Sequence, residues 1–233
     1  MSKPKLVIFA SGKKDGGGTG FENLVKGSLT GGLDAAIVAV VSNNERGEIR
    51  ERAERLGIPF IHFDPDSQHS NILKNVGMLY RKIVEKNGGE WVALSGWLKK
   101  VEGLDPKRTF NIHPALLSQL DGRFGGHGMY GRKVHEVVKR ALDAGEIAES
   151  GLTMHFVTDE MDRGPVFFEH RLPLKKGMSA EEIEKAVRQA EHEWQPKLTN
   201  MVVHGEISWD GKDPASLKVP PNYQHLPRPQ MWC

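Results

Sequence analysis

Short, continuous runs of apolar residues recur along the first half of this chain, and they constrain its fold more than any other feature. Strands that are buried on both faces, as in a parallel sheet, show such unbroken runs instead of alternating apolar and polar residues. The runs lie at residues 5–10, 35–41, 59–63, 91–94 and 109–112. Patterns with helical spacing separate them, and strands that alternate with helices indicate an α/β sheet with right-handed crossovers.

The remaining elements extend this α/β pattern. Apolar residues at helical spacing predict helices over 21–25, 72–84 and 134–142, and the second of these ends at Asn87-Gly88-Gly89. Ser179 and Glu182 form a capping box that opens a further helix, in which Pro196 predicts a kink. Two more strands are expected over 152–158 and 166–174.

These elements predict a single-domain, Rossmann-like, mostly parallel twisted sheet of about seven strands flanked by helices. We expect the domain to span residues 1–209. Residues 210–233 are rich in Pro and polar residues, and we expect them to form a tail that packs on the surface.

Charge and cysteine content narrow the class of protein. The 32 basic and 30 acidic residues give a net charge of +2 without a basic stripe, so a nucleic-acid partner is not expected. The single Cys excludes an internal disulfide and a thiolate metal site, which suits a reducing, cytoplasmic location. The first apolar run is too short to span a bilayer, so a membrane partner is not expected either.

Glycines gather after the first predicted strand. Four of them lie between Gly16 and Gly20, and a helix is expected to begin near Thr19. Backbone N–H groups at a helix N-terminus form an anion site when no side chains obstruct them. The loop matches neither the P-loop nor the dinucleotide-binding glycine pattern. From the loop alone, a phosphate cradle and a flexible loop remain equally good interpretations.

Asn111 and His113 lie at the end of the fifth predicted strand. Side chains alternate along a strand, so these two share one side of it, and Pro114 ends the strand. In open α/β sheets the ligand crevice lies at the carboxyl ends of the strands. An amide and an imidazole aimed at one point suit a developing oxyanion. A purely structural His remains the alternative.

An acidic turn, TDEMDRGP, covers residues 158–165. A carboxylate in this turn would orient His113 and raise its pKa by favouring the charged form. The same acids would also suit a divalent metal, although the nearby His residues show no clear ligand spacing, and a solvated turn is the commonest outcome.

The last predicted helix has a polar face opposite its apolar stripe, formed by Glu184, Arg188, Glu191 and Gln195. Such a face is usually solvated. If it leans over a cleft, it suits a sugar hydroxyl or an amine as its ligand.

Taken together and in this order, FNIHPALL, GMYGRKVHE, SGLTMHFVTDEMDRGPV and AEHEWQP resemble the folate-dependent phosphoribosylglycinamide formyltransferases of purine biosynthesis. The resemblance runs from the first strand to about Pro196. It implies transfer of a formyl group from 10-formyltetrahydrofolate, the co-substrate, to the amino group of 5′-phosphoribosylglycinamide. The family's catalytic residues fall on Asn111, His113 and Asp162. Asn111 and His113 would stabilise the oxyanion, and Asp162 would keep His113 protonated and assist proton transfer.

The resemblance also implies binding residues and no metal. The phosphate contacts of the ribonucleotide fall on Gly18, Thr19 and Gly20, and its glycinamide and ribose contacts on Glu191 and Arg188. The folate pocket falls on Trp97, Leu98, Lys99, Val101, Val157, Thr158 and Asp159. The chain departs from the family in four places. The first loop carries the extra residues KKDGG, and Gly20 replaces an Asn. Trp97-Leu98-Lys99-Lys100 replaces an apolar-Met-Arg-Ile/Leu run, and the segment between it and Asn111 is shorter than usual.

Alternatives share the same fold. A 10-formyltetrahydrofolate hydrolase normally carries an extra N-terminal domain, whereas this chain starts directly at its first predicted strand. Another formyltransferase of the same fold is the second alternative. A non-catalytic nucleotide-binding protein is the third, and it would be favoured if Asn111, His113 or Asp162 were replaced. The expected partners are the two small-molecule substrates, and the expected assembly is a monomer or a homodimer.

Overall fold

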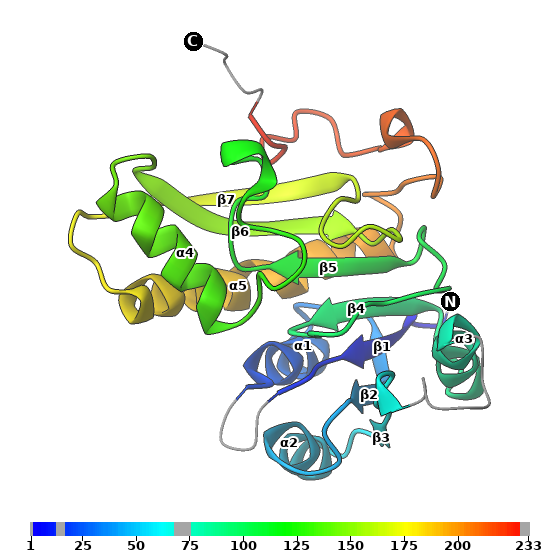
Figure 1. Cartoon of the computed structure of the whole chain (residues 1–233). Coiled ribbons are helices and arrows are strands. Elements are labelled where there is room, and N and C mark those ends of the chain that lie inside the picture. Colours follow the sequence, from blue (N-terminus) through cyan, green and yellow to red (C-terminus); the bar gives the residue numbers. More distant parts are fainter. Residues whose placement is uncertain (1, 13–16, 68–75, 229–233) are drawn as a thin grey trace.

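The computed structural model describes residues 2–12, 17–67 and 76–228, and its centre is one seven-stranded sheet with the order β3-β2-β1-β4-β5-β6-β7 (Figure 1). The five strands from β1 to β5 run parallel, and β6 is antiparallel to both of its neighbours. The strands are β1 (Lys5–Phe9), β2 (Ala36–Ser42), β3 (Phe60–His62), β4 (Trp91–Ser95), β5 (Thr109–His113), β6 (Glu149–Phe156) and β7 (Val166–Pro173). The predicted mostly parallel α/β fold is confirmed.

The central strand β1 explains why the apolar runs are unbroken. Leu6 and Ile8 are buried in one core cluster, whereas Val7 and Phe9 are buried in a second cluster. Successive side chains of a strand point to opposite faces, so both faces of the sheet are covered.

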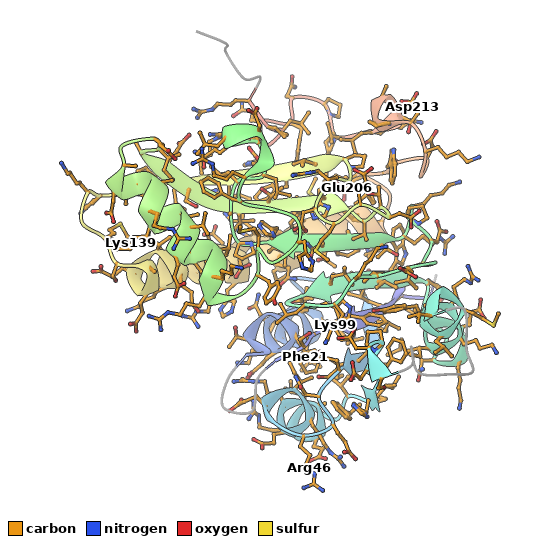
Figure 2. All side chains as sticks on the ribbon, viewed as in Figure 1. Phe21, Arg46, Lys99, Lys139, Glu206 and Asp213 are labelled. Atoms are coloured by element: carbon orange, nitrogen blue, oxygen red, sulfur yellow. The ribbon has the colours of Figure 1, made fainter. Side chains whose placement is uncertain are left out.

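Helices cover these two faces unequally. The larger core contains residues of α1 (Thr19–Thr30), α2 (Glu48–Leu56), α4 (Arg132–Asp143) and α5 (Ala180–Val203). The smaller core contains Tyr80 of α3 (Val76–Lys86), so this helix packs on the other face. Phe21 of α1 is fully buried, whereas Lys139 and Arg46 lie at the periphery (Figure 2).

Several predicted boundaries differ from the structure. The helix α2 is absent from the predicted elements because only Ile49 and Ala53 of its nine residues are buried, and charged residues surround them. Strand β6 begins earlier than predicted, at Glu149, and ends at Phe156. Residues 72–75 of the predicted third helix lie outside the described residues.

Helix α5 begins as predicted and continues beyond Pro196. The capping box is confirmed: Glu182 N donates to Ser179 Oγ over 3.2 Å, and Ser179 N donates to the Glu182 carboxylate over 2.8 Å. The helix runs through Pro196 to Val203.

The tail follows the outer edge of the sheet, where it runs beside β7 (Figure 1). Glu169 N of β7 donates to His225 O over 2.7 Å, and a β-bridge joins Ser208 to Lys218. The predicted division at residue 209 stays a prediction. Within the described part of the chain, no helix is both long and apolar enough to cross a membrane.

We expect Gly164→Ala to lower the free energy of unfolding by about 2–4 kcal/mol. A Cβ at Gly164 would lie 1.8 Å from Phe156 O, so the backbone of the turn between β6 and β7 has to move. Urea unfolding would measure the effect. Gly32→Ala is the matched control, because the nearest atom to its added Cβ lies 3.9 Å away. Equal unfolding midpoints for the two variants would contradict this prediction.

Candidate active site

A cavity of about 520 Å³ lies at the carboxyl ends of β1, β4 and β5. This is the edge of the sheet where α/β proteins bind ligands. Its walls come from the segments 17–20, 94–101, 111–114, 129–135 and 155–162 and from one face of α5. Each site residue that the sequence predicts lines this cavity.

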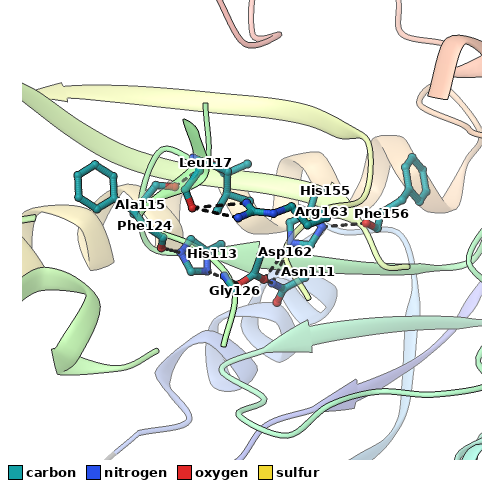
Figure 3. Close-up of polar contacts among 12 residues, drawn as sticks. Asn111, His113, Ala115, Leu117, Phe124, Gly126, His155, Phe156, Asp162 and Arg163 are labelled. Carbon is teal, nitrogen blue, oxygen red and sulfur yellow. Dashed lines mark hydrogen bonds and ion pairs between the residues drawn. The ribbon is translucent and has the colours of Figure 1, made fainter. Parts of the chain in front are cut away.

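Asp162 lies between two histidines at one wall of the cavity (Figure 3). Its Oδ2 is 3.6 Å from His113 Nδ1, and its Oδ1 is 3.4 Å from His155 Nε2. Gly126 N donates to Oδ2 over 2.9 Å. Burial by itself would raise the pKa of Asp162, but the hydrogen bond to His155, the two histidine charges and Gly126 N–H together lower it to about 2. Asp162 is therefore ionised at neutral pH.

The ring nitrogen of His113 that faces away from Asp162, Nε2, forms a hydrogen bond with the backbone. This nitrogen donates to Phe124 O over 2.7 Å, so in the neutral ring the lone pair is on Nδ1, which faces Asp162. The side chain is almost fully buried. Burial lowers the pKa of His113 more than the Asp162 charge raises it. The carboxylate therefore acts in the expected direction, but burial outweighs it and the net shift of the pKa is downward.

Asn111 contacts both Asp162 and His155. Its Nδ2 lies 3.3 Å from Asp162 Oδ1 and 3.1 Å from His155 Nε2. His155 Nδ1 lies 2.8 Å from Phe156 O, and its Nε2 contacts both Asn111 and Asp162. The three predicted catalytic side chains therefore form one contact network.

His155 and His135 are cavity residues that no sequence pattern indicates as functional. Asn111 and His155 are direct partners in the antiparallel register of β5 and β6. An estimate of that register would have found His155, since directly opposed residues of an antiparallel pair have neighbouring side chains. His135, on α4, is buried, and burial is the main reason why its pKa falls to about 4, with the charges of His113 and Arg188 adding to the effect.

The glycine loop ends at the N-terminus of α1. Gly18 is the N-cap residue and has φ 77°, which favours glycine. The side chains of α2 support this loop from behind: Arg52 Nε donates to Gly17 O over 3.2 Å, and its guanidinium also pairs with Glu22 and Glu48. Gly18, Thr19 and Gly20 at this N-terminus line the cavity. Residues 13–16 of the predicted loop lie outside the described residues.

The polar face of α5 leans over the cavity, so the solvated alternative does not apply to it. Glu184, Arg188, Glu191 and Gln195 all line the wall. Burial raises the pKa of Glu191 to about 7, while the Arg188 charge opposes this shift and the Glu184 charge adds to it.

The predicted folate residues also line the cavity. Trp97 and Val101 also belong to the smaller core, where Trp97 packs edge-on against Phe9 at a ring distance of 5.2 Å. Lys99 pairs with Asp66. Among residues 2–12, 17–67 and 76–228, no group of three or more His, Cys, Asp or Glu side chains could hold a metal ion.

Comparison with known proteins identifies the family. The family model described as formyl transferase matches residues 4–199. The chain belongs to the formyl transferase family. This membership confirms the resemblance drawn from the sequence.

Individual members of the formyl transferase family extend the comparison. The chain is 32% identical over 211 residues to the chloroplastic phosphoribosylglycinamide formyltransferase of Arabidopsis thaliana, which covers 89% of this chain and 68% of that protein. The identity to the Bacillus subtilis phosphoribosylglycinamide formyltransferase is 26% over 206 residues, which cover 85% and 94% of the two chains. A crystal structure of glycinamide ribonucleotide transformylase 1 from Symbiobacterium toebii has the same fold, with a TM-score of 0.77 at 23% identity over 94% of this chain and 95% of that one.

Proposed function

We propose that this formyl transferase passes the formyl group of 10-formyltetrahydrofolate to the amino group of 5′-phosphoribosylglycinamide. The observation that carries the proposal is the ionised Asp162 between His113 and His155, with Asn111 in contact, inside a cavity that also holds the N-terminus of α1. The cavity volume of about 520 Å³ lies in the usual range for small-molecule sites. The names of the relatives support formyl transfer and the choice of the acceptor, and the choice of donor rests on the resemblance seen in the sequence.

The acceptor lies with its phosphate at the N-terminus of α1, against Gly18, Thr19 and Gly20. The helix dipole and the backbone N–H groups of the first turn favour a dianion at this point. Glu191 and Arg188 then contact the glycinamide and ribose end. The donor lies against the wall formed by Trp97, Leu98, Lys99, Val101, Val157, Thr158 and Asp159, and the reaction needs no metal ion.

In the reaction the amine nitrogen of the acceptor attacks the formyl carbon, and the carbonyl oxygen becomes an oxyanion. The Asn111 amide stabilises this oxyanion as a donor, and His113 does so once its Nδ1 has taken up a proton. His113 is neutral beforehand because burial lowers its pKa. The growing negative charge raises its proton affinity, and Asp162 stabilises the imidazolium. The proton that the amine loses passes through His113, and the carbon–N10 bond then breaks as N10 of the tetrahydrofolate takes up a proton.

Deformylation of 10-formyltetrahydrofolate with and without 5′-phosphoribosylglycinamide tests the proposed function. We expect turnover with the ribonucleotide alone, together with formation of the N-formylated ribonucleotide. Equal turnover without the ribonucleotide would favour the hydrolase instead. Binding of both compounds without turnover would favour a non-catalytic protein.

We expect the KM for the ribonucleotide to rise as the pH falls from about 8 to about 6. The pKa of Glu191 is raised to about 7, so acidification protonates its carboxylate and removes a hydrogen-bond acceptor. One linked proton changes an apparent constant by at most about tenfold per pH unit. The steady-state KM, measured against pH, would test this.

Glu191→Gln is the matched variant for this pH dependence, because it removes the titrating group and keeps an amide of similar size. Its KM is expected to lack this part of the pH dependence. Titration of the substrate phosphate affects the wild type and Glu191→Gln alike. The contribution of Glu191 is therefore the difference between their profiles of KM against pH. Identical profiles would exclude Glu191 as the titrating group.

A further inference from the structure

Ser95 and Gln195 form a buried polar pair beneath the start of α1. Ser95 is the last residue of β4, and Gln195 lies on α5. Their exposed fractions are 6% and 1%, and both line the cavity. Ser95 Oγ donates to Gln195 Oε1 over 3.4 Å. The Gln195 amide nitrogen has no hydrogen-bond partner within the described residues, so two of its donor positions are open.

The pair occupies the space beside Gly20. A Cβ at Gly20 would lie 2.3 Å from Ser95 Oγ and 3.2 Å from Gln195 Oε1. Because side chains of this pair fill that volume, residue 20 presents only its backbone to the cavity. The hydroxyl and the amide are therefore among the side-chain groups that a ligand meets beside the first turn of α1.

The position of the pair along the cavity matches the order of groups in the proposed acceptor. Gln195 contacts the region of Gly20, where the phosphate is proposed, and it lies one helical turn beyond Glu191 on the same face of α5. A ribonucleotide has its ribose between its phosphate and its amine-bearing end. The side chains of Ser95 and Gln195 are neutral, so they suit hydroxyl groups better than a dianion or an ammonium group.

We propose that Ser95 and Gln195 form a hydrogen-bonding subsite for the ribose hydroxyls of the acceptor. The inference rests on the proposed function and extends it to the choice of acceptor. A buried amide that loses its ligand partner remains unsatisfied, so the subsite disfavours acceptors that lack the hydroxyl. Ser95 acts in two ways, because it holds the Gln195 carbonyl and presents its own oxygen to the cavity.

Gln195→Leu separates this subsite from the phosphate site. The variant keeps the side-chain volume and removes the amide. We expect the KM for the ribonucleotide and the Kd for ribose 5-phosphate to rise about tenfold or more, which corresponds to about 1.4 kcal/mol. The kcat, the KM for 10-formyltetrahydrofolate and the Kd for inorganic phosphate should change less than about twofold. Steady-state kinetics and isothermal titration calorimetry give these values.

Two further variants and one ligand sharpen the test. Gln189→Leu makes the same change at an exposed position of α5 and should leave every constant unchanged. Ser95→Ala should reproduce the effect of Gln195→Leu in weaker form. For the wild type we expect 2-deoxyribose 5-phosphate to bind more weakly than ribose 5-phosphate, and Gln195→Leu should reduce this difference.

The outcomes separate this inference from the proposed function. A wild type that binds ribose 5-phosphate but transfers no formyl group would overturn the function and leave the subsite measurable. A wild type that transfers the formyl group while Gln195→Leu binds ribose 5-phosphate equally well would overturn the subsite. If Gln195→Leu weakens the binding of inorganic phosphate as much as the binding of ribose 5-phosphate, the subsite is also overturned, because the pair would then contact the phosphate. Failure of the wild type to bind ribose 5-phosphate would overturn the subsite as well.

Discussion

Asp162→Asn is expected to reduce the kcat of formyl transfer by about 10³-fold or more, on the usual size of such effects, while ribonucleotide binding changes little. Asparagine keeps an oxygen that accepts from Gly126 N. It loses the charge that stabilises the imidazolium of His113, whose Nδ1 lies 3.6 Å away. Because Gly126 N and His113 Nδ1 both face Oδ2, the new amide nitrogen takes the Oδ1 position, beside His155 and Asn111.

Single-turnover formyl transfer at saturating substrates measures this effect without product release. Glu160→Gln is the control, because it removes an exposed carboxylate from the same acidic turn. We expect it to change kcat less than about threefold. Near-wild-type turnover of Asp162→Asn would remove Asp162 from the mechanism, whereas parallel loss of ribonucleotide binding would point to a structural role.

His113→Ala is expected to lose formyl transfer by about 10²–10⁴-fold, which is the usual contribution of a general acid or base. The variant lacks both the proton carrier and a donor to the oxyanion. It also leaves Phe124 O without its hydrogen bond, so part of any loss of stability comes from the loop that carries Phe124.

Chemical rescue separates these two consequences of His113→Ala. Added imidazole should restore part of the turnover, because it fills the space of the ring and carries a proton. His127→Ala, at an exposed position of the neighbouring glycine-rich loop, should retain wild-type turnover. Full turnover of His113→Ala without imidazole would contradict the proposed role.

The sequence predicted the elements whose information is local. The apolar runs of β1, β2 and β4 are visible because these strands are buried on both faces, and the capping box of α5 lies within four consecutive residues. The helix α2 was not predicted because it has only two buried residues, Ile49 and Ala53. Two residues are too few to show the helical spacing of an apolar face. Its importance is tertiary, since Arg52 supports the loop before α1.

In the candidate site, too, the sequence predicted the features that depend on adjacent residues and missed those that depend on distant segments. The strand period alone predicted that Asn111 and His113 share one side of β5, since this depends only on adjacent residues. Asp162 lies 51 residues beyond Asn111, and its selection from the acidic turn came from the family resemblance. The pairing of Asn111 with His155 depends on the register between β5 and β6, which no single strand contains.

By itself, the sequence determined the fold class and which residue types meet at the carboxyl edge of the sheet, because local periodicity sets both. The tertiary structure decided the charge state of these residues. Burial by distant segments lowers the pKa of His113 and raises that of Glu191 to about 7, and those segments meet only in the folded chain. The tertiary structure also decided that the side chains of Ser95 and Gln195 fill the space beside Gly20. Three elements far apart in sequence, α1, β4 and α5, meet at this point.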